Sequence, residues 1–412
     1  MPATATPHSA DPQGRRDRVT GVADRLILHI GPRKTGTTYL QRVLQQLSAS
    51  LAAQGVLYPT DYRGQDDYNH VGAVNDLTHA EESRRPERWS DKLGDDWGSL
   101  VKVVRSWDGT VVLSAEMIGG LRPAAARQLL DGLGVPATDV VITMRDLGRI
   151  FPSSWQQHIR NTHTQDYKAY LGRRARERGT LPPAEMQQSW DEERHQTFWR
   201  SYAYGALVRR WQSLAGADRV TVVTLPPAGS SSTLLWDRFR AALDIAALPE
   251  VAPALPPFVA NIGSTEPEAL LLHAMNAEAK RRGWSRRTTN ELQQRLLATG
   301  LLDRPDRGRP LLLPRKFLPQ ARAWADTDIA DLLTTGVTVH GSVEDLRVLD
   351  SSASEGKPDA SAAAAAGAYA AVHALEQEAE LIKRRNARQA RVTLPGRVLR
   401  RMIRMVEPPP RA

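Results

Sequence analysis

A short apolar run that ends in a glycine and leads into an amphipathic helix is the feature that most constrains this chain of 412 residues. The segment reads LILHIGPRKTGTTYL over residues 26–40, and leucine and valine then recur at helical spacing up to Leu51. This pattern predicts a buried strand over 26–30, a tight turn, and a helix over 38–53. Such a turn directs backbone N–H groups and the positive end of a helix dipole at one point. The sequence therefore predicts an anion site that suits a phosphate.

The position of the lysine distinguishes this loop from a nucleoside triphosphate loop, which reads G-x-x-x-x-G-K-[ST]. Gly31 and Gly36 keep the glycine spacing of that pattern, but Thr37 stands where its lysine should be. Lys34 lies inside the turn, two residues before Gly36. We expect its ammonium to approach from the loop and to reach a bridging oxygen next to the 5′ phosphate of a nucleotide.

The loop resembles the 5′-phosphosulfate loop of the sulfotransferases that use 3′-phosphoadenosine 5′-phosphosulfate (PAPS). Its pattern G-P-x-K-T-G-T-T is most similar to the bacterial and Golgi-type carbohydrate branch. The resemblance implies that Lys34 is catalytic and stabilises charge on the bridging oxygen, and that no metal is required. It implies that the cofactor is bound by Arg33, Lys34, Thr35, Gly36, Thr37 and Thr38. Tyr39 could stack on the adenine, as an aromatic does in the cytosolic branch, or face the core.

A second segment, DVVITMRDLGRIFPSSW over residues 139–155, is an apolar strand followed by an arginine and then a helix that we expect to begin near Pro152. Arg145 therefore lies at the carboxyl end of a strand, where open α/β sheets bind ligands. Ser153 follows eight residues later, at the expected helix N-terminus. In the sulfotransferase family an arginine and a serine at this spacing hold the 3′ phosphate of PAPS, which fits a guanidinium fork and a hydroxyl. Asp146 would alternatively suit a magnesium-binding carboxylate of a kinase.

Transfer of a sulfuryl group to a hydroxyl also needs a group that accepts the hydroxyl proton. Glu116 follows the expected strand over 110–114, at the place where the cytosolic branch carries a histidine. His70 lies just beyond the expected strand over 55–58, near the place where the carbohydrate branch often has a base carboxylate. Both residues are candidate bases, with Glu116 slightly favoured.

Short apolar runs alternate with amphipathic stretches along residues 25–345, which predicts an α/β fold with a P-loop-like parallel β-sheet flanked by helices, in a single domain with flexible tails. The expected strands span residues 26–30, 55–58, 110–114, 140–143, 220–225 and 337–339. The expected helices span residues 38–53, 123–133, 153–161, 198–214, 232–243 and 266–282. Residues 1–24 are predicted to be a disordered arm. Residues 346–412 are predicted to be an Ala/Ser-rich linker and a basic amphipathic tail.

The composition limits the possible partners of the protein and the cellular compartment in which we expect it. The chain has no cysteine, which excludes disulfides, thiolate nucleophiles and cysteine-type zinc sites. Residues 1–24 lack the apolar stretch of a secretory signal and no apolar run is long enough to span a membrane, so we expect a cytoplasmic protein. Ten Lys or Arg and one acid in residues 381–412 account for the whole net charge of +9. The body is thus balanced and no nucleic-acid partner is expected. Residues 383–406 either contact the anionic inner face of a membrane or form a solvated tail.

The sequence thus predicts a sulfotransferase that moves a sulfuryl group from PAPS to an acceptor hydroxyl, such as that of a carbohydrate or glycolipid, by in-line displacement. The alternatives are a P-loop kinase or other nucleotide-binding protein, and a non-catalytic protein that binds adenosine 3′,5′-bisphosphate (PAP). The identity of the acceptor and the oligomeric state stay open.

Overall fold

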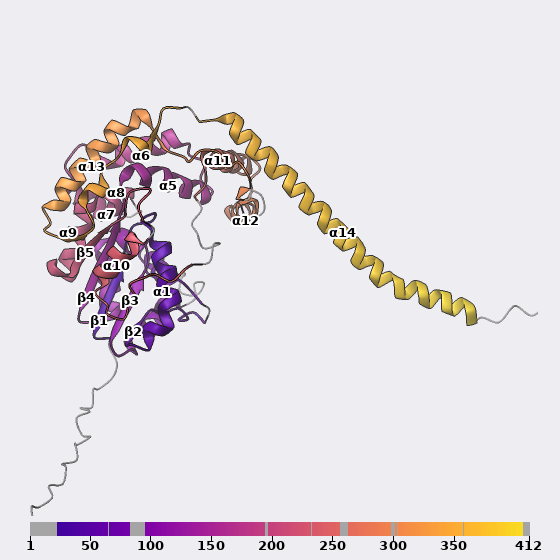
Figure 1. Ribbon diagram of the computed structural model, residues 1–412, viewed down its shortest axis with the longest axis horizontal. Coiled ribbons are helices and arrows are strands. Elements are labelled where there is room, and N and C mark those ends of the chain that lie inside the picture. The colour runs from indigo at the N-terminus through magenta and orange to yellow at the C-terminus, as the bar shows by residue number, and fades with distance from the viewer. Residues whose placement is uncertain are drawn as a thin grey trace, which may run out of the picture. The chain divides into compact units, whose positions relative to one another are not determined.

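The computed structural model describes residues 23–64, 66–82, 95–193, 197–231, 233–255, 263–297, 301–302, 304–356 and 358–406, without the side chains of 78–82 and 388–406 (Figure 1). The chain divides into two compact units. The first unit comprises Met1–Asp146, Glu177–Asn261 and Trp324–Arg347. The second unit comprises Leu147–Arg176, Ile262–Ala323 and Val348–Ala412. The predicted domain limits at residues 24/25 and 345/346 stay predictions, and residues 1–22 of the predicted arm lie outside the described residues.

A six-stranded sheet forms the centre of the first unit, with strand order β2-β3-β1-β4-β5-β7 and every pairing parallel. Its strands are β1 (Arg25–His29), β2 (Val56–Leu57), β3 (Thr110–Ser114), β4 (Thr138–Met144), β5 (Val220–Thr224) and β7 (Thr338–His340). In register, His29 lies opposite Ser114 on one side and Val141 on the other. The predicted α/β fold with a parallel sheet is confirmed, and the ends of β1, β3 and β4 meet at one edge.

Helices and 3-10 turns surround this sheet in the first unit. They are α1 (Thr37–Ala52), α2 (Val71–Glu82), α3 (Asp96–Arg105), η2 (Ile118–Gly120), α4 (Pro123–Leu133), α7 (Pro183–Glu192), α8 (Phe198–Tyr202), α9 (Tyr204–Ala215), η3 (Ala217–Arg219), α10 (Leu234–Leu243) and η7 (Val343–Leu346). Helix α13 (Leu318–Leu333) begins in the second unit and ends in the first. The single helix expected over 198–214 is two helices, because Ala203 takes an extended conformation between α8 and α9.

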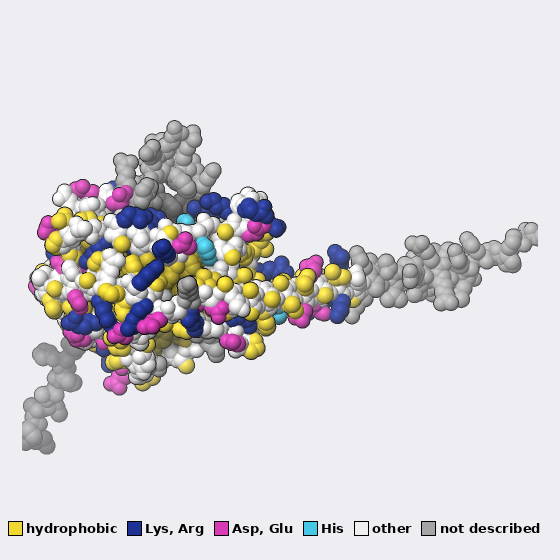
Figure 2. Space-filling model, turned by 90° about the horizontal axis from the view of Figure 1, so that it is seen from above, with side chains coloured by type: hydrophobic (Ala, Val, Ile, Leu, Met, Phe, Trp, Pro, Cys, Tyr) yellow, Lys and Arg dark blue, Asp and Glu magenta, His cyan; other side chains and the backbone are white. Residues whose placement is uncertain are grey.

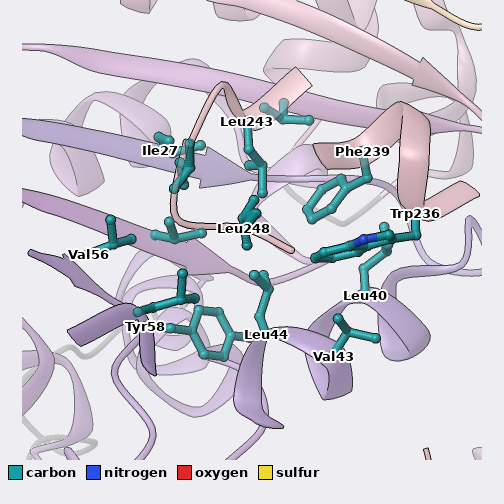
Figure 3. Close-up of a cluster of buried hydrophobic side chains, with 14 of the residues drawn as sticks. Ile27, Leu40, Val43, Leu44, Val56, Tyr58, Trp236, Phe239, Leu243 and Leu248 are labelled. Atoms are coloured by element: carbon teal, nitrogen blue, oxygen red, sulfur yellow. The ribbon is translucent and has the colours of Figure 1, made fainter. Parts of the chain in front are cut away.

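One face of the sheet packs against α1 and α10 through a buried apolar cluster (Figure 3). Strand residues such as Ile27 point into it, and α1 contributes Leu40 and Leu44. Trp236 and Phe239 of α10 close the cluster and are fully buried. The leucine and valine stripe that predicts the helix is therefore the surface by which α1 is fixed to the sheet, and this packing sets the place where α1 begins.

The second unit is largely helical. It contains α5 (Leu147–Arg160), most of α6 (Tyr167–Arg178), α11 (Glu266–Arg281), α12 (Arg286–Leu296), η6 (Arg315–Phe317), η8 (Asp350–Ser352), α14 (Ala360–Val406) and the short strands β6 (Leu313–Pro314) and β8 (Ala353–Ser354). Helix α11 packs against α5, α12 and α14. Where a linker was expected, the structure has the first turns of α14, since alanine has the highest helix propensity. Ala366 and Ala370 are buried there.

Beyond residue 370 the described part of α14 exposes apolar side chains among charged ones (Figure 2), and Val372 and Leu375 are examples. Most of the predicted amphipathic segment over 383–406 lies outside the residues whose side chains are described. Among the helices that the structure describes, none is both long and apolar enough to cross a membrane.

The start of α5 corrects one prediction. The helix begins at Leu147, directly after Asp146, so Pro152 lies inside it and Ser153 lies in its second turn rather than at its N-terminus. Aspartate is a preferred residue in front of a helix. The amide that Pro152 lacks would have bonded to the carbonyl of Gly148 in the first turn, so the proline removes a single helical hydrogen bond.

Candidate functional site

The loop between β1 and α1 needs glycine at one position and holds a lysine in an uncommon backbone conformation. A Cβ atom on Gly31 would lie 1.7 Å from the Oγ1 of Thr143 on β4, so no larger residue fits there. Lys34 and Gly36 both have left-handed backbones, with φ of 72° and 78°. This conformation is uncommon for a lysine and is typical of residues held at functional sites. Alternating left- and right-handed residues turn successive N–H groups toward a common concavity that binds anions.

Three consecutive carbonyl groups of this loop, those of residues 32–34, are each bound by a different protein donor. The Thr35 hydroxyl donates to the first (2.6 Å), the Tyr202 phenol to the second (2.8 Å) and the Arg145 guanidinium to the third (3.0 Å). The carbonyl and the N–H of one trans peptide point in opposite directions. The amides of residues 33–35 are therefore turned away from these donors.

The first turn of α1 adds further donors beside those amides. Its N-cap residue is Gly36, no side chain caps the helix, and no acidic residue stands in the first turn. The first amides of a helix have no partner within the helix. An anion is the ligand that both these amides and the helix dipole favour. Thr38 is half-buried in this turn.

The structure brings the two predicted phosphate segments together in the first unit. Arg145 follows β4, and its Nη1 donates to the Lys34 carbonyl at 3.0 Å. The Tyr204 phenol donates to the Arg145 carbonyl at 2.5 Å and accepts from the Arg145 amide at 3.1 Å. Burial raises the pKa of Tyr204, so its hydroxyl stays protonated and able to donate. Ser153 belongs to the second unit, and its part in a 3′-phosphate site stays a prediction.

Glu116 lies two residues beyond β3 and is held against the N-terminus of α1. The Thr37 hydroxyl, which is buried, donates to its Oε1 at 3.1 Å. The negative charge of Glu116 contributes to the raised pKa values of Tyr58 and Tyr68, after burial of their rings. A carboxylate oxygen thus lies next to the first turn of α1, beside two phenols.

His70 is placed differently from Glu116, because the main chain occupies both of its ring nitrogens. Its Nε2 donates to the Pro59 carbonyl at 2.9 Å, and its Nδ1 accepts from the Ser114 amide at 2.9 Å. The ring is fully buried, and this burial lowers the pKa of His70 to about 4. His70 connects the segment after β2 to the end of β3. Of the two candidate bases, Glu116 is the better placed to accept a proton.

Three other predicted residues take definite positions. Thr35 is fully buried and its hydroxyl is turned into the loop, so only its amide is left for a ligand. Tyr39 packs against the apolar cluster, as the core-facing alternative expects. Arg33 is half-buried, and its carbonyl accepts the hydrogen bond of Tyr202.

Sequence reasoning missed the residues that orient the loop. Tyr202 and Tyr204 lie on either side of the break between α8 and α9, and no local pattern marks them. His29 and Thr143 lie below the loop at the ends of β1 and β4. For His29 and Thr143, the sequence does carry a signal, since each is a polar residue at the end of an apolar strand. Within the described residues, no three His, Asp or Glu side chains are grouped so that they could hold a metal ion.

Comparison with known proteins gives little further information. No protein-family model matches the chain. No curated protein matches it. Among solved structures, the crystal structure of a sulfotransferase from Alicyclobacillus acidocaldarius is similar to 66% of this chain and 97% of its own, with 15% sequence identity and a TM-score of 0.31. A likeness at this TM-score carries no argument about fold or activity, so the functional assignment depends on the site itself.

Proposed function

We propose that this protein is a PAPS-dependent sulfotransferase that transfers a sulfuryl group to an acceptor hydroxyl. The observation that carries the proposal is the loop whose three carbonyls are bound by Thr35, Tyr202 and Arg145. This arrangement turns the loop amides away from the three donors and bonds Arg145, the predicted 3′-phosphate ligand, to the same loop. The resemblance of G-P-x-K-T-G-T-T to the PAPS loop, with Lys34 inside the turn, supports a phosphosulfate as that anion.

The residues fit the two charged ends of such a nucleotide. Amides of residues 33–38 would hold the 5′ phosphate at the uncapped start of α1. Arg145 would bind the 3′ phosphate through its guanidinium group. Both ends would therefore be held by groups that follow adjacent strands, β1 and β4, of one sheet.

When bound, PAPS supplies an activated sulfuryl group, whose sulfur bonds to the acceptor oxygen while its bond to the 5′-phosphate oxygen breaks and the electron pair stays on that oxygen. Glu116 would accept the proton of the acceptor hydroxyl, with its carboxylate held by the Thr37 hydroxyl. The Lys34 ammonium would offset the negative charge that develops on the leaving oxygen.

Binding and transfer by the full-length protein test the proposal. Isothermal titration should detect PAP binding without magnesium, and labelled PAPS with an extract of the source cells should give a labelled product. Lys34→Ala should lower transfer about 100- to 1000-fold. Lys102→Ala, on the exposed surface of α3, is the matched control and should leave it unchanged.

Three results would contradict the proposal. Near-normal transfer by Lys34→Ala would reject the role of this lysine. A preference for ATP with magnesium over PAP would favour the kinase alternative. Tight PAP binding without transfer to any component of the extract would favour a non-catalytic PAP-binding protein.

A further inference from the structure

A line of buried polar side chains connects α1 to the loop between β1 and α1 across the ends of the strands. This loop, residues 30–36, is called the anion loop below. The line connects residues at the ends of three adjacent strands, and each member has no exposed surface. The members are Gln41, Ser114, His29, Thr143 and Thr35. Consecutive members are within hydrogen-bond distance, at 3.0, 2.8, 3.3 and 2.7 Å.

The donors in this line can be ordered from one end, because a carbonyl only accepts. The Thr35 hydroxyl donates its single proton to the Pro32 carbonyl at 2.6 Å. Thr143 must then donate its single hydroxyl proton to the Thr35 oxygen. His29 must therefore donate to Thr143 through Nε2.

The other side of the imidazole ring completes the order. With its proton on Nε2, neutral His29 accepts on Nδ1, and the Ser114 hydroxyl donates to it. Ser114 in turn accepts from the Gln41 amide. Complete burial keeps the ring neutral and lowers the pKa of His29 to about 3. The ring also packs on Phe239 of the apolar cluster, with 4.8 Å between centroids, so it has little freedom to turn.

Thr143 joins this line to the loop at two places. Its hydroxyl supports the start of the loop, where a Cβ on Gly31 would lie 1.7 Å away, and it donates to Thr35 in the middle of the loop. Thr35 in turn holds the Pro32 carbonyl. The direction of the Pro32–Arg33 peptide thus depends on the Thr35 hydroxyl, which Thr143 and His29 hold in place.

We propose that Thr143 and His29 are positioning residues for the anion loop, and that His29 acts through a single tautomer that carries its proton on Nε2. The inference rests on the proposed function for the identity of the ligand. The described arrangement of the loop itself does not depend on that identity, so the two can be tested separately.

The first experiment measures the loop without any ligand. Thr143→Val keeps the shape of the side chain and removes the hydroxyl, whereas Thr143→Ser keeps the hydroxyl. Hydrogen exchange of the Tyr39 and Leu40 amides, which donate to the Gly36 carbonyl where the loop enters α1, should become at least tenfold faster in Thr143→Val and return toward wild type in Thr143→Ser. Thr224→Val is the matched control, since Thr224 is a buried threonine at the end of the adjacent strand β5, and it should leave the exchange of both amides unchanged.

The second experiment measures PAP affinity of the same variants by isothermal titration. Thr143→Val should weaken binding at least tenfold, with Thr143→Ser close to wild type. If wild-type protein does not bind PAP but the exchange results hold, the proposed function is wrong and the positioning role stands. If wild type binds PAP and Thr143→Val matches it in both exchange and affinity, the positioning role is wrong.

The third measurement is made on the wild-type protein, and a variant is used only to assign the His29 signal. Nitrogen-15 NMR of histidine-labelled wild-type protein, assigned with His29→Gln, should show one His29 resonance pair typical of a neutral ring with its proton on Nε2, unchanged between pH 5 and 8. A ring with its proton on Nδ1, or a charged ring in that range, would overturn the inference.

Discussion

Acid should destabilise this fold through His70, and the size of the effect can be worked out from the structure. The pKa of His70 is lowered from 6.5 to about 4 by complete burial, while main-chain hydrogen bonds with Pro59 and Ser114 oppose the shift. Between these values the unfolded chain binds a proton that the folded chain does not. The contribution of neutral His70 to the free energy of unfolding is therefore fully present above pH 6.5 and falls as the pH drops toward 4. A pKa shift of this size lowers the free energy of unfolding by about 3 kcal/mol at most.

The assay is urea unfolding followed by tryptophan fluorescence at several pH values between 7 and 4. His70→Gln has no charge to gain, so its free energy of unfolding should fall by about 3 kcal/mol less than that of wild type across this window. The variant will be less stable than wild type at pH 7, because it loses the contacts of the ring with Pro59 and Ser114. The test is the slope of the free energy of unfolding against pH, not its value at pH 7. Equal slopes for the two proteins would refute the claim that His70 is neutral and buried in the fold.

Three other changes have defined outcomes. Gly31→Ala places a methyl group against the Thr143 hydroxyl and should abolish PAP binding, as measured by titration. Glu116→Gln keeps the shape of the side chain but removes the base, and should lower kcat about 100- to 10,000-fold with PAP affinity little changed. Asp328→Ala leaves Arg178 buried without its partner 2.7 Å away, and should cost about 3–5 kcal/mol in urea unfolding.

Controls make these three outcomes specific. Asp326, on the same helix α13 as Asp328, forms an exposed ion pair with Arg347, so Asp326→Ala should cost less than about 1 kcal/mol. Equal losses for the two aspartates would reject the role given to burial. Wild-type kcat in Glu116→Gln would remove Glu116 as the base, and wild-type PAP affinity in Gly31→Ala would place the nucleotide away from this loop.

Much of the central sheet follows from the sequence because its signals are local. The strands around Ile27, Val112 and Val141 are short apolar runs, and the stripe from Leu40 to Leu51 has helical spacing. These patterns reflect burial directly, because each apolar face must pack against another. The start of α5 was misplaced because Pro152 signals a first turn by itself, whereas in the structure Asp146 precedes the helix and the proline lies inside it.

Most residues of the predicted nucleotide site are likewise local in sequence. The glycines, the lysine and the threonines of the loop lie within one short segment, and Arg145 directly follows a strand. In the structure, Arg145 donates a hydrogen bond to the Lys34 carbonyl of the loop. The choice between Glu116 and His70 could not be made from sequence, because it depends on which main-chain groups occupy the imidazole nitrogens.

What the sequence leaves out is the direction in which the loop's peptides face. A peptide can be flipped with little change in the path of the chain, so a glycine pattern permits the anion-binding arrangement without enforcing it. The donors that enforce it are separated from the loop by 111 residues for Arg145 and 169 for Tyr202. These contacts exist only after α8 and β4 have packed around β1. The proposed anion site would therefore be a product of tertiary structure, and a variant that retains the loop motif but loses Tyr202 should keep the sheet while binding the nucleotide more weakly.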